Sequence, residues 1–149
     1  LVFKIHPSQS DHNDEIKEII QKYSKKPQIH FLTPVLDLIQ SSDLIITITP
    51  EGWAPSTIVL ESMSLGKPTM NIILDQKFLP FQYVNQNAIL AISDDSNLES
   101  NIDKILFDDE FRQKLSTNGK NFAVNFLNNF GSASKKLANV LKEECASKG

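Results

Sequence analysis

One turn of this sequence combines two hydroxyls and a carboxylate that could bind a small ligand. The segment Pro50–Pro55 leads into Ser56 and Thr57, and Glu61 follows four residues after Thr57. If a helix begins at Ser56, its unpaired amide groups, its positive end and the two hydroxyls form an anion site without a glycine-rich loop. Glu61 then lies one turn further along the same face, where a carboxylate can accept hydrogen bonds from a ribose diol.

The same residues also have a purely structural interpretation. Serine and threonine are common helix N-caps, and Glu61 could be a buried polar anchor or a second capping partner. The structural interpretation fits Glu61 less well, because Leu60 and Met63 beside it are apolar and a glutamate is seldom buried without a partner. Gly52 and Trp53, in the turn before the helix, are candidates for the wall of a cleft, and Trp53 could equally pack in the core.

His6 is a second candidate for contact with a phosphate. It follows the apolar run Leu1–Ile5, and Pro7 restricts the backbone after it. A histidine there can donate to a phosphate oxygen, or carry positive charge toward a developing diphosphate. The alternative is that His6 caps or hydrogen-bonds a neighbouring backbone group.

Two further segments hold candidates without reactive groups. The turn Phe31–Pro34 contains Leu32 and Thr33, whose backbone could read the edge of a nucleobase, although a plain connection is the simpler interpretation. The segment Asp75–Asn87 is long for a loop. Its aromatic residues either line a cleft or pack, and they are Phe78, Phe81 and Tyr83.

The elements around these turns follow an α/β pattern. Short, continuous apolar runs alternate with helical patterns, which is typical of a parallel sheet covered on both faces. The expected strands are Leu1–Ile5, Gln28–Leu32, Leu44–Thr49, Thr69–Leu74 and Ala88–Ile92. The expected helices between them are one with the apolar face Ile16, Ile19, Ile20 and Tyr23, then Pro34–Gln40 and Ser56–Leu65.

After the last expected strand the pattern is helical only. Asp95 or Ser96 could cap the first of these helices, Asp108 could cap the second, and Gly131 breaks the chain before the last. The last helix carries Ala133, Leu137, Val140, Leu141 and Glu144 at helical spacing, with Lys135, Lys136 and Lys142 as a solvated face.

This order predicts a single domain over residues 1–149, with a Rossmann-like doubly wound parallel sheet followed by C-terminal helices. Ligands of such sheets bind beyond the carboxyl ends of the strands. The candidate turns therefore lie at the edge where a ligand is expected.

Composition excludes several classes of protein. A net charge of −3 argues against a nucleic-acid binder that works by bulk charge. Five glycines leave no room for a P-loop or a dinucleotide finger, and a lone Cys145 with three scattered histidines indicates no metal cluster.

With no signal peptide or membrane span visible, we expect a cytoplasmic protein. Because the chain starts inside an expected strand without Met, we expect a piece of a longer protein.

Three segments resemble the C-terminal, nucleotide-sugar-binding half of GT-B-fold glycosyltransferases. They are Lys4–Pro7, Leu38–Thr47 and Pro55–Pro68, and they lie within about the first 75 residues. The run Ser56–Pro68 is the most specific, and it is also similar to a segment of UDP-N-acetylglucosamine 2-epimerases. The pairing of His-Pro with Ser-Thr resembles bacterial capsule enzymes, including those that use CMP-activated sialic acid or Kdo.

The resemblance implies a role for each candidate. His6, Ser56 and Thr57 would hold the phosphates, with His6 stabilising the leaving group, Glu61 would hold the ribose, and Leu32 and Thr33 would meet the base. The family joins this domain to an N-terminal acceptor domain, which is absent here, and typically needs no metal or other cofactor. The implied substrate is a nucleotide-sugar, with a UDP-sugar favoured over a CMP-sugar. Some relatives work on lipid-linked acceptors, which implies peripheral contact with the inner face of a membrane.

The sequence also departs from the family. The two glutamates of many retaining members lie closer together than Glu51 and Glu61, so no catalytic role carries over to Glu51. The glycines and paired acids of the epimerases are absent around Ser56–Glu61, which argues against an epimerase. Two alternatives stay open, an epimerase-like enzyme and a Rossmann-like interaction module without catalytic activity.

Overall fold

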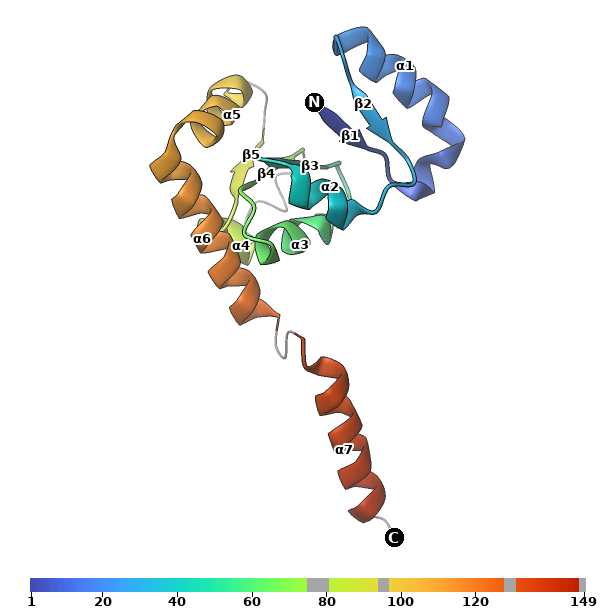
Figure 1. Cartoon of the computed structure of the whole chain (residues 1–149), viewed down its shortest axis with the longest axis vertical. Helices are drawn as coiled ribbons and strands as arrows, with labels where there is room; N and C mark the ends of the chain where they lie inside the picture. Colours follow the sequence, from blue (N-terminus) through green and yellow to red (C-terminus); the bar gives the residue numbers. More distant parts are fainter. Residues whose placement is uncertain (75–80, 94–96, 128–130, 148–149) are drawn as a thin grey trace. The chain divides into compact units, whose positions relative to one another are not determined.

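The computed structural model describes residues 1–74, 81–93, 97–127 and 131–147. The chain divides into two compact units, Leu1–Ser41 and Ser42–Gly149. Both units are α/β, and every strand pair in them is parallel, as a Rossmann-like fold requires (Figure 1). Three residues with a predicted role lie outside the described residues, and they are the candidate helix caps Asp95 and Ser96 and the aromatic residue Phe78.

The first unit is built on two short strands. Its elements are β1 (Val2–Lys4), the 3₁₀ helix η1 (Pro7–His12), α1 (Asn13–Tyr23), β2 (Gln28–His30) and α2 (Val35–Ser41). Val2 pairs with Gln28 and Lys4 with His30, and the amide of Ile5 extends the ladder to the His30 carbonyl at 3.1 Å. The carboxyl ends of β1 and β2 therefore lie side by side.

The second unit holds a three-stranded sheet in the order β3-β4-β5. Its elements are β3 (Ile45–Thr49), α3 (Ile58–Ser64), β4 (Thr69–Ile73), α4 (Gln82–Asn85), β5 (Leu90–Ile92), α5 (Leu98–Phe107), α6 (Asp109–Phe126) and α7 (Ala133–Ser147). Each expected strand and helix is present, with ends that differ by a few residues from the expected ones.

The hydrophobic core of the second unit consists of two clusters of buried residues. In one, Met70 of β4 is buried with Ile105 of α5 and Leu115 of α6. In the other, Val59 of α3 packs with residues of α4 and α6. Because side chains alternate along a strand, the neighbours of Met70 face the opposite side of the sheet. This is the two-sided arrangement that the continuous apolar runs predict.

The cover is incomplete at β3, which corrects the expectation that both faces are covered. Ile46 and Ile48 are 38% and 61% exposed, whereas Thr47 and Thr49 are buried. Both threonine hydroxyls donate to Oδ1 of Asn71, at 3.1 and 3.2 Å. The polar residues of β3 thus face inward because they have a buried partner on β4.

The expected ends of the C-terminal helices are confirmed where the structure describes them. Oδ1 of Asp108 accepts from the Phe111 amide at 2.9 Å, so Asp108 caps α6. Gly131 has a φ of +74°, a conformation that glycine adopts readily, and it precedes α7. The three lysines of α7 are exposed, as expected of a solvated face, and they are Lys135, Lys136 and Lys142.

Gly119 gives a test of the close packing of α6. A Cβ at this position would lie 2.9 Å from the Ala88 carbonyl oxygen and 3.1 Å from Cγ of Met63. We expect Gly119→Ala to lower the free energy of unfolding by about 1–3 kcal/mol, although alanine favours helices over glycine. Urea denaturation measures this change. Asn121→Ala, at an exposed site of the same helix, is the control and should not destabilise; an equally stable Gly119→Ala would contradict the packing.

The buried phenol of Tyr83 gives a second test of the packing in this unit. Its ring stacks on Phe81 and meets Phe122 edge-on, so these two predicted cleft aromatics, Phe81 and Tyr83, pack against the core. The Tyr83 hydroxyl is buried without a hydrogen-bond partner, and burial raises its pKa to about 12 from 10.0.

The folded state therefore favours the neutral phenol. The contribution of Tyr83 to the free energy of unfolding is constant below pH 10, and it is lost as the pH rises toward 12, because the unfolded chain loses the phenol proton first. Tyr83→Phe should remove this alkaline loss and leave stability at pH 7 equal or higher. Unfolding measured from pH 7 to 11.5 tests this, with Tyr23→Phe, at a 79% exposed ring, as the control. Parallel stability profiles for Tyr83→Phe and the unmodified protein would contradict it.

Candidate functional site

The connection from β3 to α3 carries most of the predicted ligand residues. The amide of Trp53 donates to the Pro50 carbonyl at 3.2 Å, and Gly52 has a φ of +78°, so a tight turn follows β3. Trp53 is 69% exposed, which places its ring outside the core. Oγ of Ser56 accepts from the Ile58 amide at 3.3 Å, so Ser56 caps the first helical amide of α3 from one position before the N-cap residue Thr57.

Thr57 and Glu61 are joined by the first turn of α3. The Glu61 amide donates to the Thr57 carbonyl at 3.1 Å, while the Thr57 side chain makes no capping hydrogen bond and is exposed. Glu61 is half-buried, and its Oε2 atom is buried without a hydrogen-bond partner. A buried acceptor without a donor costs about 1–3 kcal/mol, so this oxygen calls for an explanation.

His6 caps η1 in the first unit. Its Nδ1 accepts from the Ser8 amide at 3.1 Å and lies 2.6 Å from the Ser8 hydroxyl. The capping interpretation of His6 is therefore what the structure shows. Because Nδ1 accepts from an amide, a neutral ring carries its proton on Nε2, and the side chain is exposed. The single N–H donor of the neutral ring, on Nε2, is thus left available by the cap.

The turn after β2 is held by a histidine that the sequence reasoning did not single out. Leu32 is 96% exposed, so the turn begins earlier than the expected strand end. Thr33 is half-buried, and its Oγ1 lies 2.9 Å from Nδ1 of His30. Lys4 also contacts this region, since its ammonium donates to the Phe31 carbonyl at 2.6 Å. The sequence signal for both residues is their place at the ends of adjacent expected strands.

The candidates fall into two groups, one in each unit. The first unit brings His6 and the turn with Leu32 and Thr33 to the carboxyl ends of the paired strands β1 and β2. The second unit holds Gly52, Trp53, Ser56 and Thr57 on the connection from β3 to α3, and Glu61 in the first turn of α3.

Asn71 is a buried polar residue that the sequence analysis passed over. It is fully buried on β4, its Oδ1 accepts from two threonines, and its Nδ2 has no hydrogen-bond partner. A donor with no exposure can meet an ordered water in the core but not a ligand at the surface. An asparagine inside an apolar run was the available signal.

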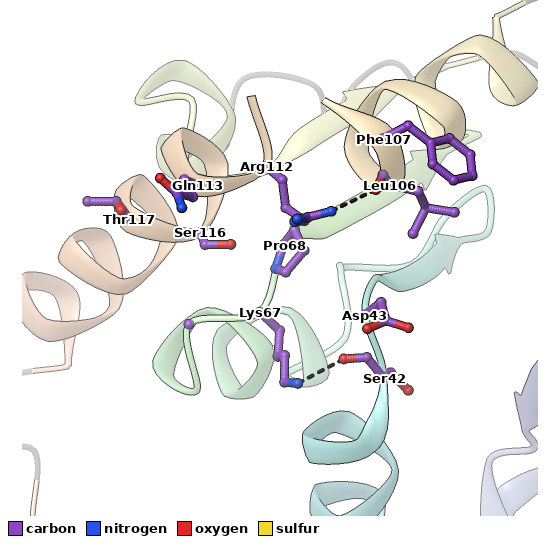
Figure 2. Close-up of a pocket in the computed structure, with 11 residues that line it drawn as sticks. Ser42, Asp43, Lys67, Pro68, Leu106, Phe107, Arg112, Gln113, Ser116 and Thr117 are labelled. Carbon is purple, nitrogen blue, oxygen red and sulfur yellow. Dashed lines mark hydrogen bonds between the residues drawn. The ribbon is translucent and has the colours of Figure 1, made fainter. Parts of the chain in front are cut away.

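A cavity of about 750 Å³ lies at the opposite edge of the sheet in the second unit (Figure 2). Its walls include Asp43 and Pro68, which precede β3 and β4, and neither belongs to the candidate turns. The Lys67 ammonium donates to the Ser42 carbonyl at 2.8 Å, and Arg112 donates to the Leu106 carbonyl at 2.6 Å and pairs with Asp109. These cations already have acceptors, and Asp43 adds a negative charge to the wall.

Two searches of the described residues were negative. Within those ranges, no three or more His, Cys, Asp or Glu side chains are grouped so that they could hold a metal ion. In the same part of the chain, no helix has both the length and the apolar character that a membrane span needs.

Comparisons with known proteins were also negative. No family model matches the chain, and neither the curated proteins nor the solved structures include a match.

The cap at His6 predicts a tautomer. In the neutral ring the proton should reside on Nε2, because Nδ1 accepts from the Ser8 amide. Long-range ¹H–¹⁵N NMR of the histidine rings at pH 8 distinguishes the two tautomers. Ser8→Pro removes the donor amide and should abolish the preference, whereas Ser10→Ala should leave it intact. A neutral His6 protonated on Nδ1 would contradict the cap.

Proposed function

We propose that this chain is the donor-binding domain of a GT-B-type glycosyltransferase, acting in surface or capsular polysaccharide or other glycan biosynthesis. The proposal assigns a nucleotide-sugar as the substrate of the candidate turns, with UDP-sugars favoured and CMP-sugars next. It also assigns a cytoplasmic location, with peripheral contact at the inner face of a membrane, and an acceptor domain in the same protein.

The unpartnered Oε2 of Glu61 is the observation that supports this proposal best. The carboxylate lies in the first turn of α3, after a connection with an exposed threonine hydroxyl and a capping serine. A ribose diol presents two adjacent hydroxyl donors, which a carboxylate with an unused oxygen accepts. Because Oε2 is buried without ligand, the Glu61 side chain turns outward to accept them in this proposal. The neighbouring hydroxyls and amide groups then contact the phosphates that are attached to the ribose.

The proposed mechanism is a displacement at the anomeric carbon of the sugar. An acceptor hydroxyl forms the new carbon–oxygen bond while the bond to the nucleotide phosphate breaks, and the electron pair leaves with the nucleotide. Hydrogen bonds that grow stronger as this charge develops lower the barrier. In the second unit, Thr57 and Ser56 supply hydroxyls for such hydrogen bonds. The proton of the acceptor hydroxyl passes to a base of the acceptor domain. We therefore expect residues 1–149 alone to bind the nucleotide but not to catalyse sugar transfer.

A nucleotide panel tests the proposal directly. Thermal unfolding should be compared without ligand and with UDP, CMP, CDP, GDP and ADP. A ligand that binds only the folded state stabilises it by about 2.7 kcal/mol at a hundredfold excess over its dissociation constant. That corresponds to a shift of a few degrees for a domain of this size. No shift with any nucleotide would contradict the proposal and favour the interaction module.

Glu61→Gln tests the residue on which the proposal rests. The amide keeps the shape of the carboxylate but replaces one acceptor oxygen by a donor, so one of the two hydrogen bonds from a ribose diol is lost. We expect roughly ten- to a hundredfold weaker nucleotide binding by isothermal titration calorimetry. The ligand-free protein should be as stable as before, since Oε2 has no internal partner to lose.

Glu99→Gln is the matched control for this experiment. Glu99 also lies in the first turn of a helix, and it is exposed on α5. Its replacement should change neither nucleotide affinity nor stability. Equal affinities of the Glu61→Gln and Glu99→Gln variants would exclude Glu61 from the site.

A further inference from the structure

The last helix of the chain, α7 (red in Figure 1), exposes its apolar residues to solvent. Leu137, Val140 and Leu141 are each more than half exposed, and every residue from Ala133 to Ala146 is exposed. An isolated helix of 15 residues is only marginally stable in water, because most helices in proteins are stabilised by packing of an apolar face. The uncovered apolar residues of α7 therefore favour a partner surface.

The exposed apolar residues of α7 have the spacing of a coiled-coil contact. The residues at alternating intervals of four and three positions are Ala133, Leu137, Val140 and Glu144. These four residues form the seam of α7, and Leu141 lies beside the seam and widens it. Residues with this spacing lie along one side of a helix, where a second helix packs. The seam is short, because a helix of 15 residues is about 22 Å long.

The charges beside the seam make α7 complementary to a reversed copy of itself. Lys136 and Glu143 each precede a seam residue by one position, so they lie on the same edge of the seam. In an antiparallel pair of helices the same edges of the two seams meet. When Leu137 of each copy lies opposite Val140 of the other, Lys136 of each copy lies beside Glu143 of the other. Two ion pairs of opposite charge then flank the apolar contact.

Glu144 disfavours a parallel arrangement of the same two helices. In a parallel pair each seam residue meets its own copy, so two Glu144 carboxylates would face each other. In the antiparallel pair Glu144 lies opposite Ala133, whose small side chain leaves room for the carboxylate to reach solvent. Exposed ion pairs add little to affinity, so the charges select the orientation while the apolar residues supply the attraction.

We propose that α7 is a self-association surface, on which a second copy of this chain packs its own α7 in antiparallel orientation. Leu137, Val140 and Leu141 make the apolar contact, and the two Lys136–Glu143 ion pairs flank it. So small an interface gives a weak dimer, which forms between micromolar and millimolar protein. The proposal is independent of the proposed function, because the association needs no nucleotide and either can fail alone.

Sedimentation equilibrium from low micromolar to millimolar protein tests the association. The dimer fraction should rise with concentration, and Leu137→Gln should weaken the dimer roughly tenfold or more, because apolar contact is lost on both copies while helix propensity is kept. Ala138→Gln, exposed on α7 but off the seam, is the control and should leave the dimer unchanged. A monomer at every concentration would overturn the proposal, as would equal association of the two variants.

Reversal of single charges tests the antiparallel orientation. Lys136→Glu brings two acidic groups together in each flanking pair, and Glu143→Lys brings two basic groups together, so each variant alone should associate several-fold more weakly. An equimolar mixture of the two variants should restore the dimer, because every flanking pair then joins a lysine to a glutamate. Both changes also suit the helix dipole, so α7 itself is not weakened. Failure of the mixture to restore association would overturn antiparallel pairing.

Hydrogen exchange on the unmodified protein locates the contact. Amides of α7 should exchange several-fold more slowly in concentrated than in dilute protein, because pairing stabilises the helix. The amides of Leu115 and Phe122, at buried positions of α6, serve as the reference and should not change with concentration. Exchange in α7 that is independent of concentration would overturn the proposal, even if the protein associates through another surface.

Discussion

Parallel strand pairing is the constraint on which the other features of this protein depend. Parallel strands end at the same edge, and each needs a crossover to return, so strand-to-helix turns gather there. In the first unit the Lys4–His30 register sets the distance between the turns after β1 and β2. In the second, pairing of β3 with β4 aligns Thr47 and Thr49 with Asn71. The candidate turns and the buried polar cluster both follow from this geometry.

Four buried polar atoms of the described residues have no hydrogen-bond partner, and they are Oδ1 of Asn13, Oε2 of Glu61, Nδ2 of Asn71 and the hydroxyl of Tyr83. Tyr83 and Asn71 lie in the interior, where no ligand can reach them, and each costs stability unless a water serves it. In Glu61 the Oε2 atom is just as buried, but the residue as a whole is half-buried beside an exposed turn, so a partner from solution reaches this oxygen only when the side chain turns outward. Location rather than lack of a partner therefore separates a ligand candidate from a cost of packing.

The sequence predicted the elements better than the contacts. Continuous β-branched runs and the Asp108 cap depend on neighbours in the sequence, and both were confirmed. The exposure of Ile46 and Ile48 was not predictable, because hydrophobicity alone places isoleucine inside and threonine outside. Asn71 reverses this order through hydrogen bonds across two strands, which requires knowledge of the register. The cap at His6 was one of two weighed alternatives, and the pattern could not choose between them.

Comparison of the lysines and arginines bound to carbonyl oxygens shows why position matters for function. Arg112 donates to the Leu106 carbonyl, but Asp109 neutralises its charge, and it lines a cavity at the amino ends of the strands. Lys4 makes two similar contacts at the carboxyl ends and has no acidic partner in the described ranges. Carbonyl contacts reduce the entropy that a lysine loses when it binds an anion, because the side chain is already ordered. The two cations therefore differ in charge balance rather than in order, because Lys4 is held by neutral carbonyl oxygens alone and Arg112 by a carbonyl and a carboxylate.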